Sequence, residues 1–237
     1  MSALPFADLL RIALVLFLAV AQALAAYWPE LRGARHTITS RSAAVDTPVV
    51  PWGPFFAVWL LLFAASLGFA GWHAAQGAAG PAALGWLAAA LFAGNVLWEI
   101  WVPRRGLDRW SVAIIGAELA LALVALAVTV RWAPEGWAFW LGAVPLQLFA
   151  GWVAVAAFAN LSSTMKAEGA HAPWMLLGCA VVTAAGVAAW SGAVGFAATA
   201  AWGLAGIAAK AGLGRSWAYG GVAAIGAVVT LGLVVLR

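Results

Sequence analysis

The fold is decided by a stretch at residues 109–132, which reads RWSVAIIGAELALALVALAVTVRW. Between Arg109 and Arg131 this stretch carries a single charged side chain, that of Glu118. A helix that crosses the hydrocarbon of a bilayer needs about 20 mostly apolar residues, and a tryptophan near each end suits the two headgroup levels. The stretch therefore predicts a transmembrane helix.

The whole chain has the composition that this stretch suggests. Its 237 residues are 66% hydrophobic and 8% charged, and its mean hydropathy is +1.00. Soluble domains keep roughly a quarter of their residues charged, so this chain cannot cover a surface that faces water. The composition indicates an integral membrane protein and argues against the soluble enzyme classes.

Few side chains suit metal, cofactor or nucleic-acid chemistry. Cys179 is the single cysteine, which excludes a disulfide framework and a cysteine-rich metal site, and the three histidines, His36, His73 and His171, are scattered. The net charge is only +4, and the loop arginines behind it suit lipid headgroups better than nucleic acid. No catalytic triad or phosphate loop is present. We expect no catalytic residue, no metal, no nucleic-acid partner and no cofactor required for folding.

Cuts at charges, prolines and glycines divide the chain into eight apolar segments, since backbone polar groups in a bilayer must be satisfied within each segment. The fold class is therefore all-α, a polytopic membrane helix bundle. A seven-span alternative merges the last two segments, but Lys210 and Arg215 favour a turn between them. The expected spans cover residues 5–27, 52–75, 80–102, 109–132, 137–164, 172–190, 193–209 and 215–236.

The distribution of positive charge predicts the orientation. The first segment ends in alanine triplets like those of a signal-peptide cleavage site, but Asp8 and the interfacial pair Tyr27-Trp28 favour a retained helix. Loops 1, 3, 5 and 7 should be cytoplasmic and both termini outside, as in a bacterial inner-membrane protein, because cytoplasmic loops collect lysine and arginine. Those loops hold nine of the twelve positive residues: Arg32, Arg35, Arg41, Arg104, Arg105, Arg109, Lys166, Lys210 and Arg215.

Tryptophan is several times more frequent than usual, with 16 copies. Segment ends hold Trp28, Trp132, Trp137, Trp140, Trp174 and Trp217, as expected for belts at the two headgroup levels. Four other tryptophans, Trp59, Trp98, Trp110 and Trp152, belong to motifs that follow one another along the chain. These are a proline-rich start to the second span, PWGPFFAVWLLLF at 51–63, an Asn-x-x-Trp at 95–98, Trp110, and a Trp-x-x-x-Ala-x-x-x-Asn at 152–160.

Over residues 5–164 this order and spacing resembles the tryptophan-rich sensory protein and translocator protein family (TspO/MBR). The resemblance implies a five-helix ligand-binding bundle at residues 1–170. The three short transmembrane helices expected at 171–237 depart from the family pattern as a C-terminal extension. It also implies a pocket between the helices that the first loop closes. The residues implied to line the pocket are Trp59, Asn95, Trp98, Trp110, Ala113, Trp152, Ala156 and Asn160.

Family members bind porphyrins, haem-related tetrapyrroles, sterols and synthetic aromatic compounds, so a porphyrin or haem is the expected ligand. Independently of the family, Trp152, Ala156 and Asn160 share one helical face at i, i+4 and i+8. Indole faces there would stack on a flat ring, and an amide would meet a polar substituent. The segment after Asn160, residues 161–164, lacks the tyrosine of the cholesterol-recognition pattern, which argues against sterols.

Two carboxylates and a group of basic side chains in the first loop invite a functional reading. Glu118 is a possible functional carboxylate, because an ionisable group inside a bilayer costs about 2.5 kcal/mol or more. We expect it to face a polar cavity or a partner such as Gln147. Glu99 is expected to form an interfacial ion pair with Arg104 or Arg105. The first-loop side chains Arg32, Arg35, His36 and Arg41 either meet ligand carboxylates or only mark the cytoplasmic side.

Several functions remain open. The leading hypothesis is binding of a tetrapyrrole for sensing or transport; the alternatives are tetrapyrrole breakdown and a structural role in a larger membrane pigment-protein complex. Asn95 and Asn160 could also serve only as interhelical hydrogen bonds of about 0.6–2 kcal/mol each. Small residues at 178–186 and 220–226 predict close packing of the last helices, and a homodimer or docking to another membrane complex is possible.

Overall fold

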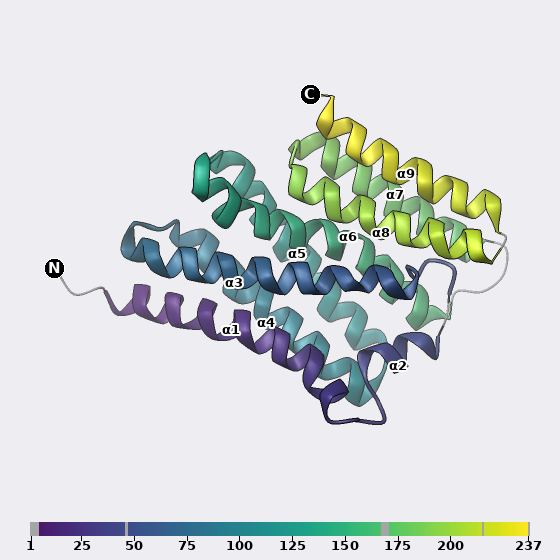
Figure 1. Cartoon of the computed structure of the whole chain (residues 1–237), viewed down its shortest axis with the longest axis horizontal. Helices are drawn as coiled ribbons and strands as arrows, with labels where there is room; N and C mark the ends of the chain where they lie inside the picture. Colours follow the sequence, from purple (N-terminus) through teal and green to yellow (C-terminus); the bar gives the residue numbers. More distant parts are fainter. Residues whose placement is uncertain (1–4, 46, 167–170, 215, 237) are drawn as a thin grey trace.

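The computed structural model describes residues 5–45, 47–166, 171–214 and 216–236, and all the regular structure in these ranges is helical (Figure 1). Eight of the helices there are long and apolar enough to cross a membrane, which confirms the predicted all-α bundle of eight spans. The elements are α1 (Phe6–Leu31), α2 (Ile38–Ala43), η1 (Gly53–Ala57), α3 (Val58–Gln76), η2 (Gly77–Ala79), α4 (Ala82–Arg105), α5 (Arg109–Trp132), η3 (Ala138–Ala143), α6 (Val144–Met165), α7 (Ala172–Ser191), α8 (Val194–Leu213) and α9 (Trp217–Val235).

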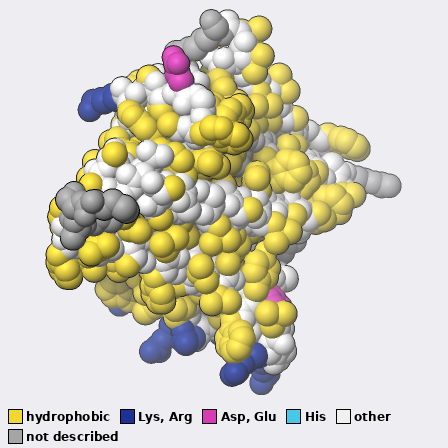
Figure 2. All heavy atoms as spheres, turned by 60° about the vertical axis from the view of Figure 1, so that its left-hand side comes forward, with side chains coloured by type: hydrophobic (Ala, Val, Ile, Leu, Met, Phe, Trp, Pro, Cys, Tyr) yellow, Lys and Arg dark blue, Asp and Glu magenta, His cyan; other side chains and the backbone are white. Residues whose placement is uncertain are grey.

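The surface of the bundle is apolar, as a lipid-facing surface must be. Figure 2 shows hydrophobic side chains over most of one face, with lysine and arginine side chains toward its margins. Large side chains such as Leu60, Val182 and Val228 are more than half exposed. The helices therefore turn apolar side chains outward as well as inward, which is the pattern of membrane spans.

Helix α6 lies at the centre of the arrangement. It packs against α3, α5, α7 and α8, while α1 packs against α3 and α4 on one side of the molecule and α9 packs against α7 and α8 on the other (Figure 1). The last three helices therefore join the first five through α6, above all through its contact with α8.

A glycine sets the distance between α6 and α8. A Cβ atom on Gly151 would overlap the carbonyl oxygen of Phe196 and the hydroxyl of Thr199. That hydroxyl donates a hydrogen bond back across the contact to the Leu148 carbonyl (2.6 Å). Small residues at such contacts let helix backbones approach closely in membranes.

Close packing among the last helices occurs at only some of the glycines that the sequence suggested. A Cβ on Gly226 would lie 2.7 Å from Val181 Cγ2, which confirms that α9 and α7 approach closely there. At Gly178 and Gly186 the expectation is wrong, since no described heavy atom lies within 4 Å of such a Cβ. Both face outward because α7 turns its alanines, Ala180 and Ala184, toward the core.

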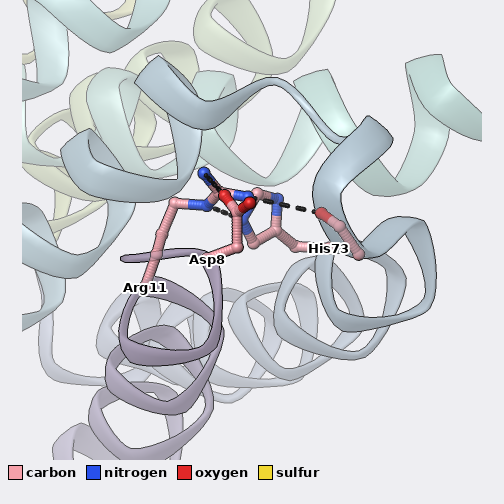
Figure 3. A network of polar contacts seen from close by, with 4 residues as sticks. Asp8, Arg11 and His73 are labelled. Atoms are coloured by element: carbon pink, nitrogen blue, oxygen red, sulfur yellow. Dashed lines mark hydrogen bonds and ion pairs between the residues drawn. The ribbon is translucent and has the colours of Figure 1, made fainter. Parts of the chain in front are cut away.

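A buried charge ties the start of α1 to α3 (Figure 3). Arg11 is 2% exposed, and its guanidinium contacts the Asp8 carboxylate (2.7 Å), His73 Nε2 (3.0 Å) and the Gly77 carbonyl (3.3 Å). Because Arg11 Nε donates to His73 Nε2, the imidazole acts as an acceptor. The charge is thus paired and hydrogen-bonded, as a buried charge must be.

Helix α8 holds the second half of the first loop, residues 47–57. The loop runs past Gly206, where a Cβ would lie 2.8 Å from Pro51 Cβ and Phe55 Cγ. The Trp202 ring lies against the Phe55 ring, with centroids 4.6 Å apart. Three hydrogen bonds join the two parts: the Trp52 N–H to the Gly206 carbonyl (3.0 Å), Trp202 Nε1 to the Phe55 carbonyl (2.8 Å) and Lys210 Nζ to the Thr47 carbonyl (2.8 Å).

The contact at Gly151 predicts the effect of adding one methyl group. Gly151→Ala should lower the free energy of unfolding by about 1–3 kcal/mol, because the new Cβ must push α8 away from α6. Thermal unfolding in detergent micelles measures the loss. Gly178→Ala is the matched control, since its Cβ has open space. Equal melting temperatures for the two variants would contradict the described α6–α8 contact.

The loop contacts predict the effect of removing one indole N–H. Trp202→Phe keeps a ring beside Phe55 but leaves the Phe55 carbonyl without its indole donor. A lost hydrogen bond of about 1 kcal/mol should speed amide exchange of residues 47–57 roughly fivefold. Hydrogen exchange with mass spectrometry measures it. The control is Trp190→Phe, at an exposed position of α7; unchanged exchange in Trp202→Phe would show that α8 does not hold the loop.

Candidate functional site

A cavity of about 460 Å³ lies between the first loop and helices α1, α3 and α4. Helix α2 contributes Ile38 and Ser42 to its wall, so the first loop borders the cavity as the resemblance implied. The aromatic part of the lining comes from Tyr27 on α1, Phe56 on η1, Trp59 and Phe63 on α3, and Trp98 on α4.

A smaller pocket of about 50 Å³ adjoins this cavity and reaches between α4, α5 and α6. Both spaces are bordered by Phe56, Trp59 and Trp98, so these three rings stand between them. The deeper residues of the small pocket are Asn95 on α4, Glu118 on α5, and Trp152, Ala156 and Asn160 on α6.

The structure brings together most of the residues expected from the sequence. Trp59, Asn95, Trp98, Trp152, Ala156, Asn160 and Glu118 all line one or both of the two spaces. Trp110 and Ala113 stand apart from the described lining residues. Trp110 is 54% exposed, and Ala113 is exposed as well. Helix α5 turns Ser111, Ile115 and Glu118 inward, which places these two on its outer face.

The aromatic side chains brace one another. Trp59 stacks on Phe63, with ring centroids 5.5 Å apart, and meets the edge of Trp152 at 5.9 Å. Phe56 meets Trp152 in a similar edge contact at 5.7 Å. Offset-stacked and edge-to-face pairs at such distances are favourable. The wall is therefore stiff, and a flat ring would find indole faces already in place.

Several buried polar atoms around the two spaces have no hydrogen-bond partner among the described residues. An unpartnered buried polar group costs about 1–3 kcal/mol, and folded proteins contain few of them. Their concentration in one place marks it as a candidate binding site with both donors and acceptors. They are Trp98 Nε1, Glu99 Oε2, Glu118 Oε1, Trp152 Nε1 and Asn160 Nδ2.

Neighbouring helices orient the two amides. Asn95 Nδ2 donates to Gln22 Oε1 on α1 (3.0 Å) and to Glu99 Oε1 one turn along α4 (3.0 Å). On α6, Asn160 Oδ1 accepts from the Ser111 hydroxyl (3.0 Å), while Asn160 Nδ2 has no partner among the described residues. The same residues thus serve as interhelical bonds and as cavity lining.

The start of α5 is fixed by its cap, which positions Ser111. The Asp108 carboxylate accepts from the backbone N–H groups of Trp110 and Ser111, and Ser111 Oγ accepts from the Asp108 N–H. Burial acts to raise the pKa of Asp108. Hydrogen bonds from Ser111, Trp101 and Trp110 and the charge of Arg109 outweigh that effect, so this pKa lies below its usual value.

The structure contradicts one expectation for the carboxylates and decides between the two alternatives for the other. Glu99 was expected to pair with Arg104 or Arg105 at the interface; instead it is 1% exposed and bonded to Asn95. The helical period of α4 puts Glu99 on its buried face and both arginines on the exposed side. Gln147 is not the partner of Glu118, because its Oε1 accepts from the Gly195 N–H on α8 (3.4 Å). Glu118 faces the small pocket instead, which agrees with the other alternative expected from the sequence, a cavity.

The first-loop arginines lie beside the cavity rather than in its described lining. The Arg32 guanidinium sits over the Trp28 ring at 4.4 Å, and Arg41 donates to the Pro103 carbonyl (3.3 Å). Sequence reasoning missed Glu99 and Glu30 as lining residues. The spacings Asn95–Glu99 at i, i+4 and Tyr27–Glu30 at i, i+3 were the signals that could have found them.

Comparison with known proteins gives one positive finding. The family model described as TSPO-like protein matches residues 9–236, and this match continues through α7, α8 and α9. No curated protein and no solved structure matches the chain. A match that spans all eight long helices, over a bundle with a buried aromatic cluster, shows that this chain belongs to the TSPO-like protein family.

Proposed function

We propose that the protein binds a flat hydrophobic aromatic compound in the cavity, with tetrapyrroles such as protoporphyrin or haem as the first class to test, for sensing or transport. The observation that carries the proposal is the coincidence of an indole-walled cavity with unpartnered buried polar atoms. Ligand sites are mostly apolar cavities of about 300–1,000 Å³ with a few convergent polar groups. The family relationship supports the same class of ligand.

One ligand would occupy both spaces, with its ring system in the larger cavity and a substituent in the smaller pocket. The larger cavity, about 460 Å³, has room for a fused ring system beside Trp59 and Trp98. The smaller pocket, about 50 Å³, admits only a small substituent, which would reach the Trp152 and Asn160 donors. A ligand held this way gains stacking on the rings and hydrogen bonds at its inner end.

A titration with protoporphyrin tests the proposal. Trp152→Phe keeps an aromatic ring but removes the Nε1 donor, and the lost hydrogen bond should raise Kd about three- to tenfold. Asn95→Ala, which also releases Gln22 and Glu99, should raise it at least as much. The porphyrin absorbance band in detergent measures binding without relying on tryptophan fluorescence.

Trp110→Phe is the matched control, because Trp110 lies on the outer face of α5 and should leave Kd unchanged. If all three variants bound protoporphyrin as the wild type does, uptake would be non-specific and the proposal would fail.

We further infer that the cavity mouth faces the cytoplasm. The loops next to it carry most of the positive residues, including Arg32, Arg35 and Arg41, and such loops stay on the cytoplasmic side. Cysteines introduced into a Cys179→Ser background test this with a membrane-impermeant maleimide on intact bacterial cells. Glu135→Cys, in the exposed turn before η3, should be labelled at once, and Arg35→Cys only after permeabilisation. The reverse pattern would invert the orientation.

A further inference from the structure

The charged side chains that line the two spaces are acidic. Glu30 and Glu99 border the larger cavity and Glu118 the smaller pocket, and the described lining of both includes no lysine or arginine. The nearby cations Arg41 and Lys210 instead donate to backbone carbonyls. A ligand that enters the cavity therefore meets negative charge or hydrogen-bond acceptors on its walls.

Two of these carboxyl groups are deeply buried and incompletely bonded. Glu99 is 1% and Glu118 is 2% exposed. Glu99 Oε1 accepts from Asn95, while Glu99 Oε2 and Glu118 Oε1 have no partner in the described part of the chain. A buried carboxylate is costly unless it is paired or hydrogen-bonded. Both groups are thus positioned to accept a hydrogen bond from an occupant.

The helices bring the two carboxyl groups to the same region. Glu118 on α5 packs beside Gly94 on α4, since a Cβ on Gly94 would lie in ordinary contact, 3.8 Å, with Glu118 Cβ and Cγ. Glu99 follows Gly94 by five residues on α4, and the Trp98 ring borders both spaces. One ligand beside Trp98 can therefore approach both carboxyl groups.

The indole faces favour the same kind of ligand. A cation over the face of a tryptophan is attracted by the ring, most strongly where water is excluded. Trp59 and Trp98 both line the larger cavity. An anionic ligand would gain nothing from these faces and would be repelled by the carboxylates.

Building on the proposed function, we infer that the cavity selects flat aromatic compounds that carry a basic or N–H-donating nitrogen, directed at Glu99 and Glu118, and that it rejects compounds with a carboxylate at that end. A tetrapyrrole would have to direct its carboxylates away from Glu99 and Glu118. This selectivity adds a second requirement, a basic or N–H-donating nitrogen, to the aromatic ring of the proposed ligand.

Three probes that share one ring system test the inference: 9-aminoacridine, which is a cation, 9-methylacridine, which is neutral, and acridine-9-carboxylate, which is an anion. Their binding to the full chain in a neutral detergent is followed by fluorescence anisotropy. Wild-type protein should bind the cation at least about tenfold more tightly than the anion. Glu99→Gln and Glu118→Gln preserve side-chain shape, and each should remove most of that preference.

Two further variants complete the design. Glu135→Gln removes a carboxylate outside the described lining, so its preference should match the wild type. Glu30→Gln alters an exposed residue that lines the mouth, so folding should be unaffected and the preference should fall by a smaller factor. This variant keeps the test decisive if a buried variant does not fold.

The outcomes separate the two proposals. If the neutral probe binds in a Trp152-dependent way but the anion binds as tightly as the cation, or the three lining variants keep the wild-type preference, the inference is wrong and the proposed function stands. If neither protoporphyrin nor any acridine binds, both are wrong. A preference for the cation that depends on Glu99, Glu118 and Glu30 supports the inference.

Discussion

The structure depends on α6 having close neighbours on almost every side. Consecutive residues of a helix point about 100° apart, so Gly151 and Trp152 serve different neighbours. Gly151 admits the backbone of α8, while Trp152 contacts Trp59 and Phe56 and lines the small pocket. The larger cavity lies where the first loop meets α1, α3 and α4, and Phe56 and Trp59 in its wall rest on Trp152 of α6. Because lipid provides no hydrophobic driving force between helices, close van der Waals contacts and interhelical hydrogen bonds carry much of the packing energy.

Polar groups in the bundle fall into two kinds. Near the start of α1, Arg11 has its charge paired and its donors largely satisfied, so it contributes to holding α1 on α3. Toward the other end of α1, around Trp98, donors and acceptors are left without partners in the described chain. In the described chain the Arg11 network leaves one buried nitrogen without a partner, His73 Nδ1, whereas five unpartnered atoms surround the two spaces. The contrast supports assigning a structural role to the first group and a binding role to the second.

Hydropathy and the charge pattern were sufficient to predict the eight spans, because crossing a bilayer demands long apolar helices whatever their packing. The motifs that follow one another along the chain were also sufficient to predict Trp59, Trp98 and Trp152 as lining residues. Trp110 and Ala113 were grouped with them although α5 turns them outward, since helix rotation is set by neighbours rather than by local sequence. Glu99 was assigned to the interface because charges nearby in sequence suggested a pair, and burial of its face could not be seen in a helix that is apolar all round. The contacts between α8 and the first loop use backbone carbonyls, which leave no mark in the sequence.

Because of those backbone contacts, the two parts of the first loop are held by different helices. Residues 47–57 are fastened to α8, and Thr47 also bonds Ser162 on α6 (2.7 Å). The preceding part, with α2, is joined to α4 mainly through Arg41. A version of the chain cut short after α6 would keep the aromatic wall but lose the contacts from α8 that support residues 47–57 beside it.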